Sequence, residues 1–415
     1  MKILMAHPTG NANVRAVIKA FEGSNMLAEF NTTIAIDADS KWLKCLSPEI
    51  REQLLRRQFS MMPKMLKSHP MAELARILLP KVGLQRYTTQ EHSWASIDSV
   101  YRKLDQKVAS RVDKLQKQKQ ISAVYGYEDG SLQTFKRAKE LGLTCIYDLP
   151  IAYWHTGRLL MQEEAERLPE WAETLGGGIK DSDEKLERKT QEMQMADVVV
   201  TPGGFVKESI PDWAKMKQII VSPFGSPKWI APNILDPQPA RQNRLRVLFA
   251  GSLSQRKGLG DLFNALKLLN SPNIELVVMG SLTVPLAFYQ SQLPSFTYLS
   301  NRPHHKVLEL MRSCDVFCLP SIVEGRALVM QEAMSQGLPI IITPNTGGED
   351  LIIEGVTGFL VPIRSPEAIA NKLSWFLENR SKVKEMGRSA QEHAANYTWD
   401  AYGSNIVKKL LEHRR

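Results

Sequence analysis

Long apolar runs are absent from this sequence. No stretch approaches the roughly 18 to 20 consecutive apolar residues that cross a bilayer, and the opening segment MKILMAHPTG leads directly into a strand-like run, unlike a signal peptide. Both absences predict a cytoplasmic protein. Cysteine is also scarce, and the sequence predicts neither a disulfide framework nor a zinc site from the four that occur. These are Cys45, Cys145, Cys314 and Cys318.

Acidic residues are scarce in one region. Residues 41–120 contain 17 Lys and Arg against 7 Asp and Glu, a local charge of +10, so this region accounts for the formal charge of +9 of the whole chain. Between residues 42 and 82 the basic residues are mixed with leucine and methionine. This mixture favours peripheral contact with an anionic membrane or a lid over a groove, but ordinary amphipathic helices with solvated charges explain it equally well. Aromatic residues are too few there to favour nucleic acid.

The chain has 415 residues, 43% of them hydrophobic, which is enough for two cores. Strand-like runs alternate with helical stretches in both halves, which predicts an α/β protein with parallel sheets. The proline-rich segment 226–243 predicts a linker between an N-terminal domain, 1–225, and a C-terminal domain, 244–395. The strand-like runs cover residues 2–8, 31–37, 122–127, 143–150 and 197–203, then 246–251, 274–280, 296–300, 315–321, 338–344 and 358–363.

Two further segments are helical by pattern. The tail, from about 396 to 415, has apolar residues at near-helical spacing, including Tyr402, Ile406 and Leu410, which predicts a helix docked on a folded surface. Residues 158–197 are charged and helical but contain three consecutive glycines from 176 to 178. The second segment therefore predicts an irregular pair of helices.

The turn after the strand-like run 246–251 suits a phosphate group. Gly251 and Ser252 are small, and Arg256 and Lys257 precede a helical stretch. Backbone N–H groups at a helix start and two cations together can bind a diphosphate. Glycine and lysine also occur in such turns for tight packing and solubility, so the turn alone is a weak signal.

Two glutamates follow the strand-like run 315–321. Glu324 and Glu332 are eight residues apart, roughly 10 to 12 Å along a helix, which is comparable to the span from sugar to ribose in a folded nucleotide sugar. Carboxylates accept hydrogen bonds from neighbouring hydroxyls, and the backbone N–H groups of residues 326–328 suit phosphates. The alternative is one glutamate that complements a helix dipole and an unrelated one on the surface.

The order of short motifs around these glutamates is more specific. Pro-Ser at 320–321, Glu-Gly at 324–325 and Glu-Ala-Met at 332–334 are followed by GLPIIITPNTGG and EGVTGFLVP. In this order they resemble glycosyltransferase family 4, the retaining GT-B enzymes within glycosyl transferases group 1. The resemblance covers about 244–380. It implies two Rossmann-like domains facing across a cleft, with the C-terminal helix crossing back to the N-terminal domain.

The resemblance also implies roles for the donor-side residues. Glu324 would contact the hydroxyls of the donor sugar, Glu332 the ribose, and Lys257 the diphosphate. Relatives commonly have arginine where this chain has Ser252, and Arg256 is the expected substitute. Arg326 occupies a variable position, where it would either contact a phosphate or point to solvent. The remaining residues expected at the donor site are Gly10, Gly251, Arg302, Gly325, Ala327 and Leu328.

The acceptor side resembles the family less. The histidine that many members have at the end of an N-terminal strand is absent from IYDLPIAYWH. Asp148 and His155 are the available substitutes, as are Tyr127 and Glu128, although a carboxylate at a strand end can equally form a turn. His7, after the first strand-like run, is expected to be structural.

By this resemblance the chain would be a retaining glycosyltransferase, and the group that it transfers would be a hexosyl group. It would move the sugar from a UDP-, GDP- or ADP-sugar to a glycan, a lipid-linked or a small-molecule acceptor. Charge on the departing diphosphate would be stabilised by Lys257, Arg256 and helix N–H groups in a front-face displacement. No Asp-x-Asp motif stands at a fitting strand end, so neither a metal nor another cofactor is predicted.

Other functions remain open at this stage. A dehydrogenase needs Gly-x-Gly-x-x-Gly after the first strand, which HPTGNANVR lacks. An epimerase or phosphorylase of the same fold would keep the cleft with different acidic or cofactor-binding residues. A non-catalytic protein of GT-B shape, held at a membrane or an anionic glycan by residues 41–120, would also account for the altered positions.

Overall fold

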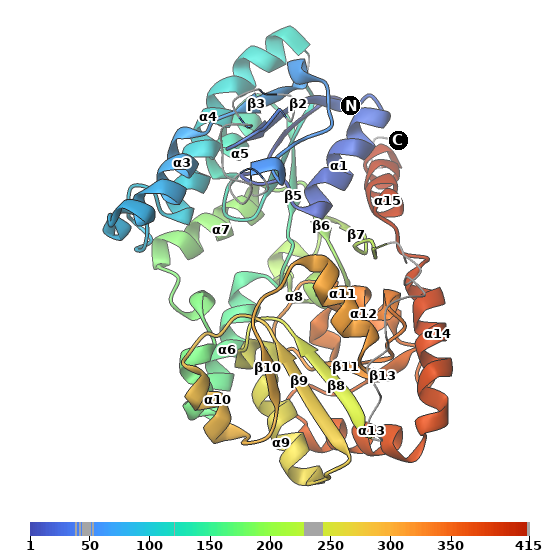
Figure 1. The fold of residues 1–415 in the computed structure, drawn as a ribbon. Coiled ribbons are helices and arrows are strands. Elements are labelled where there is room, and N and C mark those ends of the chain that lie inside the picture. The colour runs from blue at the N-terminus through green and yellow to red at the C-terminus, as the bar shows by residue number, and fades with distance from the viewer. Residues whose placement is uncertain are drawn as a thin grey trace.

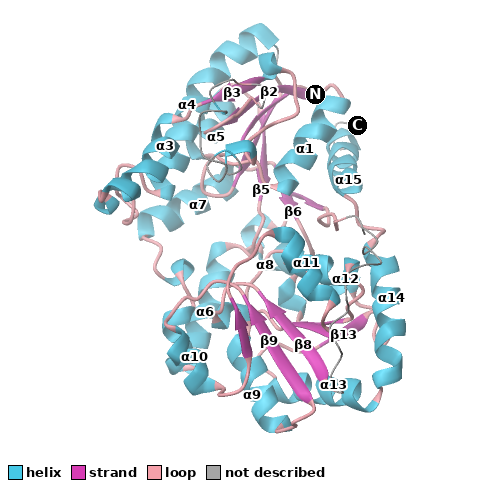
Figure 2. Ribbon diagram, viewed as in Figure 1, coloured by secondary structure: helices cyan, strands magenta, loops and turns pink. Residues whose placement is uncertain are grey.

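The structure is a computed structural model, and it shows two parallel sheets, each with helices on both faces (Figures 1 and 2). This arrangement confirms the predicted α/β class. Among the described residues, no helix is long and apolar enough to cross a membrane. The described residues are 1–37, 40, 43, 51, 54–119, 121–227 and 244–412.

The N-terminal sheet has the strand order β3-β2-β1-β4-β5-β6-β7, and every neighbouring pair is parallel. Its strands are rich in buried aliphatic residues because helices cover both faces. The strands are β1 Ile3–Ala6, β2 Leu27–Thr32, β3 Leu66–Ser68, β4 Ala123–Tyr127, β5 Thr144–Asp148, β6 Val198–Thr201 and β7 Gln218–Val221. The helices are α1 Ala12–Gly23, α3 Met71–Leu78, α4 Ile97–Lys119, α5 Leu132–Glu140, α6 Trp154–Arg167, α7 Asp183–Met195 and α8 Gly204–Ser209.

The C-terminal sheet has the order β10-β9-β8-β11-β12-β13 and is also parallel throughout. Its strands are β8 Leu245–Ala250, β9 Ile274–Met279, β10 Thr297–Leu299, β11 Val316–Leu319, β12 Ile340–Ile342 and β13 Gly358–Leu360. The helices after β7 are α9 Leu259–Leu269, α10 Leu286–Gln292, α11 His304–Arg312, α12 Leu328–Ser335, α13 Pro366–Glu378, α14 Val383–Ala394 and α15 Trp399–Glu412.

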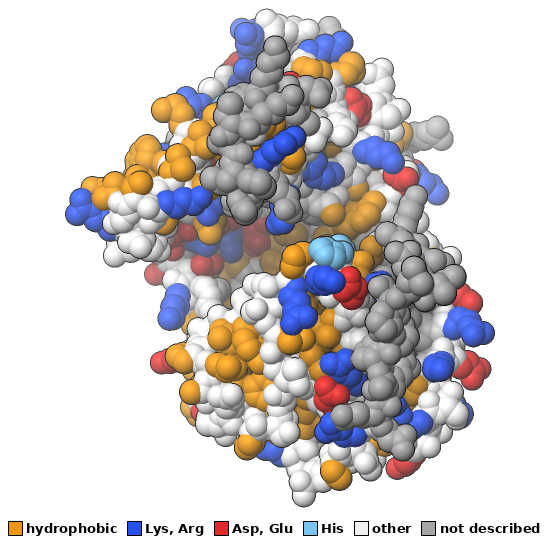
Figure 3. All heavy atoms as spheres, in the orientation of Figure 1, with side chains coloured by type: hydrophobic (Ala, Val, Ile, Leu, Met, Phe, Trp, Pro, Cys, Tyr) orange, Lys and Arg blue, Asp and Glu red, His pale blue; other side chains and the backbone are white. Residues whose placement is uncertain are grey.

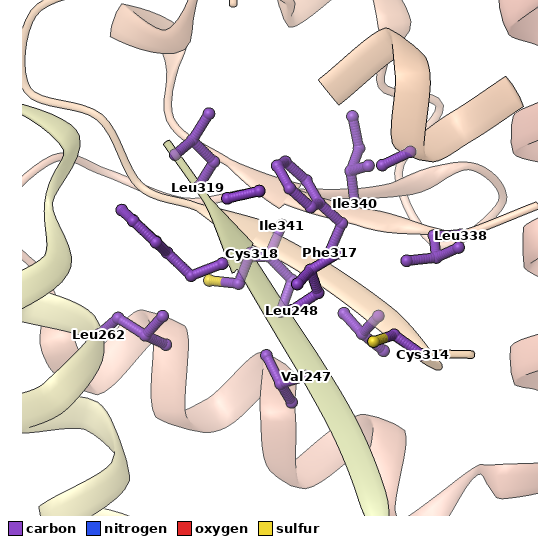
Figure 4. Close-up of a cluster of buried hydrophobic side chains, with 14 of the residues drawn as sticks. Val247, Leu248, Leu262, Cys314, Phe317, Cys318, Leu319, Leu338, Ile340 and Ile341 are labelled. Atoms are coloured by element: carbon purple, nitrogen blue, oxygen red, sulfur yellow. The ribbon is translucent and has the colours of Figure 1, made fainter. Parts of the chain in front are cut away.

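Two cysteines belong to the core of the C-terminal domain. Figure 4 shows Cys314 and Cys318 among aliphatic side chains and Phe317. Both thiols are free, as is the buried Cys145 in β5. Burial raises the pKa of Cys314 to about 12, so this thiol stays protonated at neutral pH and acts as a small apolar side chain. Cys45 lies outside the described residues.

The C-terminal helix crosses back to the N-terminal domain, as expected. Figure 1 shows α15 beside α1, and Tyr402, Ile406 and Leu410 pack in the same apolar cluster as Val17 and Phe21 of α1. The two helices approach closely at Gly403, because a Cβ there would lie 2.7 Å from the Ala16 carbonyl oxygen. The amphipathic tail therefore completes the core of the N-terminal domain.

A second crossing runs the opposite way. Helix α6 and the 3-10 helix η5, Pro169–Thr174, lie against the C-terminal domain (Figure 1), where Trp171 packs edge-to-face on Phe263 and Tyr289. Arg167 pairs with Asp261 at 2.8 Å. Part of the segment assigned to the N-terminal domain by sequence thus packs on the other sheet. The predicted linker lies almost entirely outside the described residues, since only 226 and 227 of it are described.

Some strands differ from the prediction. The run 31–37 was expected to form the second strand, but β2 ends at Thr32 and the loop that follows returns to Pro8 through the hydroxyl of Thr33. Strands β3 and β7 were not predicted, because β3 has only three residues and β7 is half-exposed at the sheet edge. Short edge strands lack the buried apolar run that identifies a central strand in a sequence.

Candidate functional site

A cavity of about 1460 Å³ lies between the two sheets. Its lining comes mainly from turns that follow the carboxyl ends of strands: Ser252 after β8, Gly280 after β9 and Glu324 after β11 face His7 after β1 and Glu128 after β4. Ligands of open α/β sheets bind at this edge. Figure 3 shows the surface hollowed between the two domains, with basic side chains at its rim.

Three charged side chains meet on the C-terminal wall of the cavity. Arg256 Nη1 donates to Glu324 Oε1 at 2.7 Å, and Lys257 Nζ contacts the same oxygen. The Lys257 and Glu324 side chains are only 12% and 11% exposed. The sequence separates these residues by nearly 70 positions, and the parallel pairing of β8 with β11 brings them together.

The pKa values of this cluster reflect its burial. Burial lowers the pKa of Lys257, and the neighbouring Glu324 offsets this only in part. Burial alone would raise the pKa of Glu324, but Lys257 and Arg256 hold it below its usual value. Glu324 therefore stays ionised at neutral pH and keeps both cations at the cavity wall.

The backbone around these cations allows little room for side chains. Gly280 has φ +149°, and a Cβ there would lie 1.7 Å from the Gly251 carbonyl oxygen. Gly258, which ends the 3-10 helix η8, Gln255–Lys257, has φ +72°. A Cβ at this position would lie 2.0 Å from the Pro320 carbonyl oxygen. These close approaches join the turns after β8, β9 and β11 into one surface.

Glu332 lies in α12 at the far part of the same wall. Its carboxylate oxygen is 3.9 Å from His304 Nδ1, at the start of α11, and Arg302 lines the cavity nearby. Burial raises the pKa of Glu332, and His304 opposes the rise. Both predicted glutamates thus face one cavity. Gly251, Ser252, Ala327 and Leu328, which were predicted to bind the donor, also line this cavity.

Arg326 takes neither of its two expected places. Its guanidinium is completely buried, donates to Gln331 Oε1 and the Gly347 carbonyl oxygen, and pairs with Asp350 at 2.7 Å. Arg326 lines the cavity, but its side chain is not exposed to solvent and its charge is paired with Asp350. The Ala327 N–H, expected to suit a phosphate, donates instead to the Thr346 carbonyl oxygen at 3.2 Å.

Gly325 joins the two domains. A Cβ on this residue would lie 1.8 Å from the carbonyl oxygen of Pro150 in the N-terminal domain, and the Ala152 N–H donates to the Glu324 carbonyl oxygen at 3.4 Å. The Glu-Gly pair is therefore also a contact point between the domains, which its motif in the sequence did not indicate.

Besides Gly325, three other predicted residues do not line the cavity. Gly10 is covered by the Phe59 ring, and its neighbours Asn11 and Ala12 line the cavity instead. His155 is exposed in the first turn of α6, outside the cavity lining. Asp148 is 1% exposed and accepts a hydrogen bond from the Tyr125 hydroxyl at 2.6 Å.

The burial of Asp148 explains its place in the fold. Burial raises the pKa of this carboxyl to about 7, although the neighbouring tyrosine hydroxyls oppose the rise. The side chain points into the tyrosine cluster between the sheet and α15, so it is not available to a ligand in the cavity. The sequence places Asp148 at the end of β5 but does not show whether its side chain points into the cavity or into the core.

Two residues that line the N-terminal side were not predicted to do so: Lys189 had no expected role, and His7 was expected to be structural. Lys189 reaches the cavity from α7 and His7 from the turn after β1. Burial lowers the pKa of His7 to about 4, so its imidazole is neutral at physiological pH. No motif in the sequence around Lys189 indicates that this residue of a charged helix lines the cavity. Among the described residues, no group of three or more His, Cys, Asp and Glu could hold a metal ion.

Known proteins share parts of this sequence and its whole fold. Residues 232–393 match the family model described as "Glycosyl transferases group 1". The D-inositol 3-phosphate glycosyltransferase of Corynebacterium glutamicum is 30% identical over 173 residues, which are 39% of this chain and 41% of that protein. The curated relatives are matched over between 26% and 47% of their own lengths.

Two solved structures match over the full length. Sucrose-phosphate synthase from Thermosynechococcus elongatus has a TM-score of 0.64 at 14% identity and covers 100% of this chain and 98% of its own. Anabaena HepE in complex with UDP has a TM-score of 0.61 at 15% identity and covers 99% and 100%. The fold is GT-B, as the resemblance implied.

Proposed function

We propose that this chain, whose C-terminal domain belongs to glycosyl transferases group 1, transfers a sugar from a nucleotide-sugar donor to a hydroxyl-bearing acceptor. The observation that carries the proposal is the buried group of Lys257, Arg256 and Glu324 in the cavity between the sheets. Two cations beside one carboxylate suit a diphosphate and a sugar that are bonded to each other. The HepE structures contain UDP or UDP-glucose, which supports a uridine nucleotide.

The charge distribution suggests how the reaction proceeds. As the bond between sugar and diphosphate breaks, negative charge grows on the diphosphate, and Lys257 and Arg256 are the cations that would stabilise that charge. Preorganised cations in a water-poor site stabilise such charge far more than in bulk water. Glu324 would accept hydrogen bonds from sugar hydroxyls, and Glu332 from the ribose. We propose retention of configuration by front-face displacement, as in family 4.

Nucleotide binding and donor turnover test this proposal. Thermal unfolding is measured with UDP, GDP and ADP, because a ligand at 100 times its Kd stabilises the folded chain by about 2.7 kcal/mol. UDP-, GDP- and ADP-sugars are then incubated with the protein, and release of the nucleoside diphosphate is followed. We expect one nucleotide to bind and its sugar to be hydrolysed slowly. Binding without any turnover would favour a non-catalytic protein, and no binding would contradict the proposal.

We also propose that the N-terminal domain contacts an anionic membrane at its periphery. Helix α3 and the turn after it present an apolar face: Met71, Leu74, Leu78 and Val82 are 80%, 39%, 53% and 68% exposed. Lys81 and Arg86 are exposed beside it, and Figure 3 shows apolar and basic side chains together on this lobe. An apolar face with basic neighbours suits an interface with anionic lipid.

Liposome sedimentation tests this membrane contact. Vesicles with anionic lipid should retain the protein at low salt, and Leu78→Glu should abolish the retention because it places a charge in the apolar face. Leu268→Glu is the matched control, since Leu268 is 59% exposed on the other domain. Full recovery of the wild-type protein in the supernatant would contradict the contact.

A further inference from the structure

A second cavity, of about 440 Å³, adjoins the first on the side of α6 and α7. Four residues line both cavities: Glu128, Lys189, Ser252 and Arg256. Two of them, Ser252 and Arg256, belong to the turn assigned above to the donor diphosphate. A ligand in the second cavity would therefore end next to the bond between donor sugar and diphosphate.

Glu128 stands at this junction with an unused hydrogen-bonding group. It follows β4 directly, its side chain is 10% exposed, and its Oε1 has no hydrogen-bond partner among the described residues. The nearest cation is Lys189 Nζ at 3.9 Å, beyond hydrogen-bonding distance. Nearly all buried carboxylate oxygens in folded proteins are hydrogen-bonded. Oε1 is an enclosed atom without a described partner, on a residue that lines both cavities, which points to a hydrogen-bonding partner that comes from a ligand.

The charges around Glu128 are already paired. Lys185 of α7 contacts Asp181 at 3.0 Å, Asp98 at 3.1 Å and Asp129 at 3.6 Å, and Lys189 contacts Asp181 at 3.4 Å. Arg188 also pairs with Asp129, at 2.5 Å, so three cations balance the three aspartates without a hydrogen bond to Glu128. Such a wall favours a neutral hydroxyl donor over an anion as the partner of this carboxylate.

The rest of the second cavity suits a polyhydroxyl molecule. The backbone at Gly176 and Gly177 is open, because a Cβ at either would meet nothing within 4 Å. Ser252 and Ser254 also line this cavity, and their hydroxyl oxygens are 3.4 Å apart. Exposed peptide groups and small hydroxyls bind sugars and polyols through many neutral hydrogen bonds.

We propose that the second cavity is the acceptor site, and that Glu128 binds the attacking hydroxyl of a sugar or polyol; this inference rests on the proposed transferase function. The hydroxyl oxygen bonds to the anomeric carbon of the donor while the bond from that carbon to the diphosphate breaks. The electron pair of the broken bond leaves with the diphosphate, and the hydroxyl proton, which is hydrogen-bonded to Glu128, passes to that carboxylate. Glu128 orients the hydroxyl for this step.

The ionisation of Glu128 gives the site a pH dependence. Burial raises the pKa of this carboxyl to about 6; Lys189 opposes the rise, while Asp129 and Asp181 add to it. Only the ionised form is purely a hydrogen-bond acceptor. The rate should therefore be complete above pH 7 and should fall as the pH drops through about 6.

Glu128→Gln tests the assignment with water as the attacking hydroxyl. Release of nucleoside diphosphate from the donor that the wild type hydrolyses is measured between pH 5 and 9, with Glu170→Gln, an exposed residue of η5, as the control. We expect Glu128→Gln to bind the nucleotide within about 2-fold of the wild type but to turn over at least about 10-fold more slowly, without the acid limb. The control should match the wild type.

The outcomes separate this inference from the function on which it rests. Wild-type nucleotide binding and hydrolysis together with an unchanged rate and acid limb in Glu128→Gln would overturn the acceptor site alone. A wild-type profile that is flat through pH 6 would also overturn it, and this measurement needs no variant to fold. A wild-type protein that binds no nucleotide would overturn both. Unaltered nucleotide affinity in Glu128→Gln also serves as the check that the variant is folded.

Discussion

The two walls of the main cavity are built in different ways. The C-terminal wall consists of turns within one domain, and its charged residues Lys257, Arg256 and Glu324 are hydrogen-bonded to one another before any ligand arrives. The N-terminal wall is assembled from β1, β4 and α7, and one of its carboxylate oxygens, on Glu128, has no hydrogen bond. The C-terminal wall therefore holds its charges in fixed pairs, whereas the N-terminal wall keeps one carboxylate oxygen without a partner among the described residues.

The largest effect should follow from removing the central cation of the C-terminal wall. Lys257→Ala should slow donor turnover by about 100- to 1000-fold, because it removes charge stabilisation from the departing diphosphate and leaves Glu324 with one cation fewer. Steady-state release of nucleoside diphosphate measures the effect. Lys267→Ala, exposed on α9, is the control. Turnover near that of the wild type would contradict the assignment of the departing diphosphate to the C-terminal wall.

Arg326→Met should change stability, in contrast to Lys257→Ala. The substitution leaves Asp350 and the Gly347 carbonyl oxygen without their partner, and we expect the free energy of unfolding to fall by about 3 kcal/mol. Urea unfolding measures the loss, with the exposed Arg388→Met as control. If nucleotide affinity fell while stability stayed the same, Arg326 would belong to the donor site after all.

Glu332→Gln should have a smaller effect, confined to the nucleotide. A carboxylate that accepts hydrogen bonds from two ribose hydroxyls contributes more than a neutral amide, so we expect the Kd of the nucleoside diphosphate to rise about 10-fold. Calorimetric titration of the variant and of Glu309→Gln, which is paired with Lys306 on α11, measures this. An unchanged Kd would remove Glu332 from the donor wall.

Asp148→Asn should have the smallest effect on turnover and should change the pH dependence of stability. The carboxyl has a pKa of about 7 in the folded chain against about 4 when unfolded. Between these values the folded state binds more protons, so Asp148 makes the chain less stable as the pH rises from 4 to 7. The amide removes this decline. Melting temperatures from pH 5 to 8 measure it, and a turnover loss above 2-fold would return Asp148 to the acceptor side.

The contrast between the walls also explains what the sequence predicted. The short motifs at 320–334 form the turn after β11 and most of α12, so Glu324 and Glu332 could be proposed for a common site from their order. The N-terminal wall depends on which face of a strand points into the cavity and on a helix 60 residues away. Asp148 and Glu128 both stand at strand ends, and only tertiary packing distinguishes the buried one from the one at the cavity.

Local patterns predicted central strands and failed where tertiary contacts decide. The strand-like run 31–37 contains β-branched residues, but only its first two residues belong to β2, and the rest of the run leaves the strand. Arg326 was expected to contact a phosphate or solvent. Its partner Asp350 is 24 residues away in the sequence, and no local pattern predicts this ion pair. The packing of α6 and η5 on the C-terminal domain likewise depends on the apolar site that holds Trp171, and this site forms only when that domain folds.

The two crossings make the domains poor units for separate expression. A fragment that ends at 225 would lack α15, whose Tyr402 and Ile406 fill its core, and would expose Trp171. A fragment that begins at 244 would have an empty slot between Phe263 and Tyr289. Each domain's core contains side chains from a segment that belongs to the other half of the chain. A protease that cuts between the two halves should therefore leave them bound to each other. We expect the two fragments to separate only when they unfold.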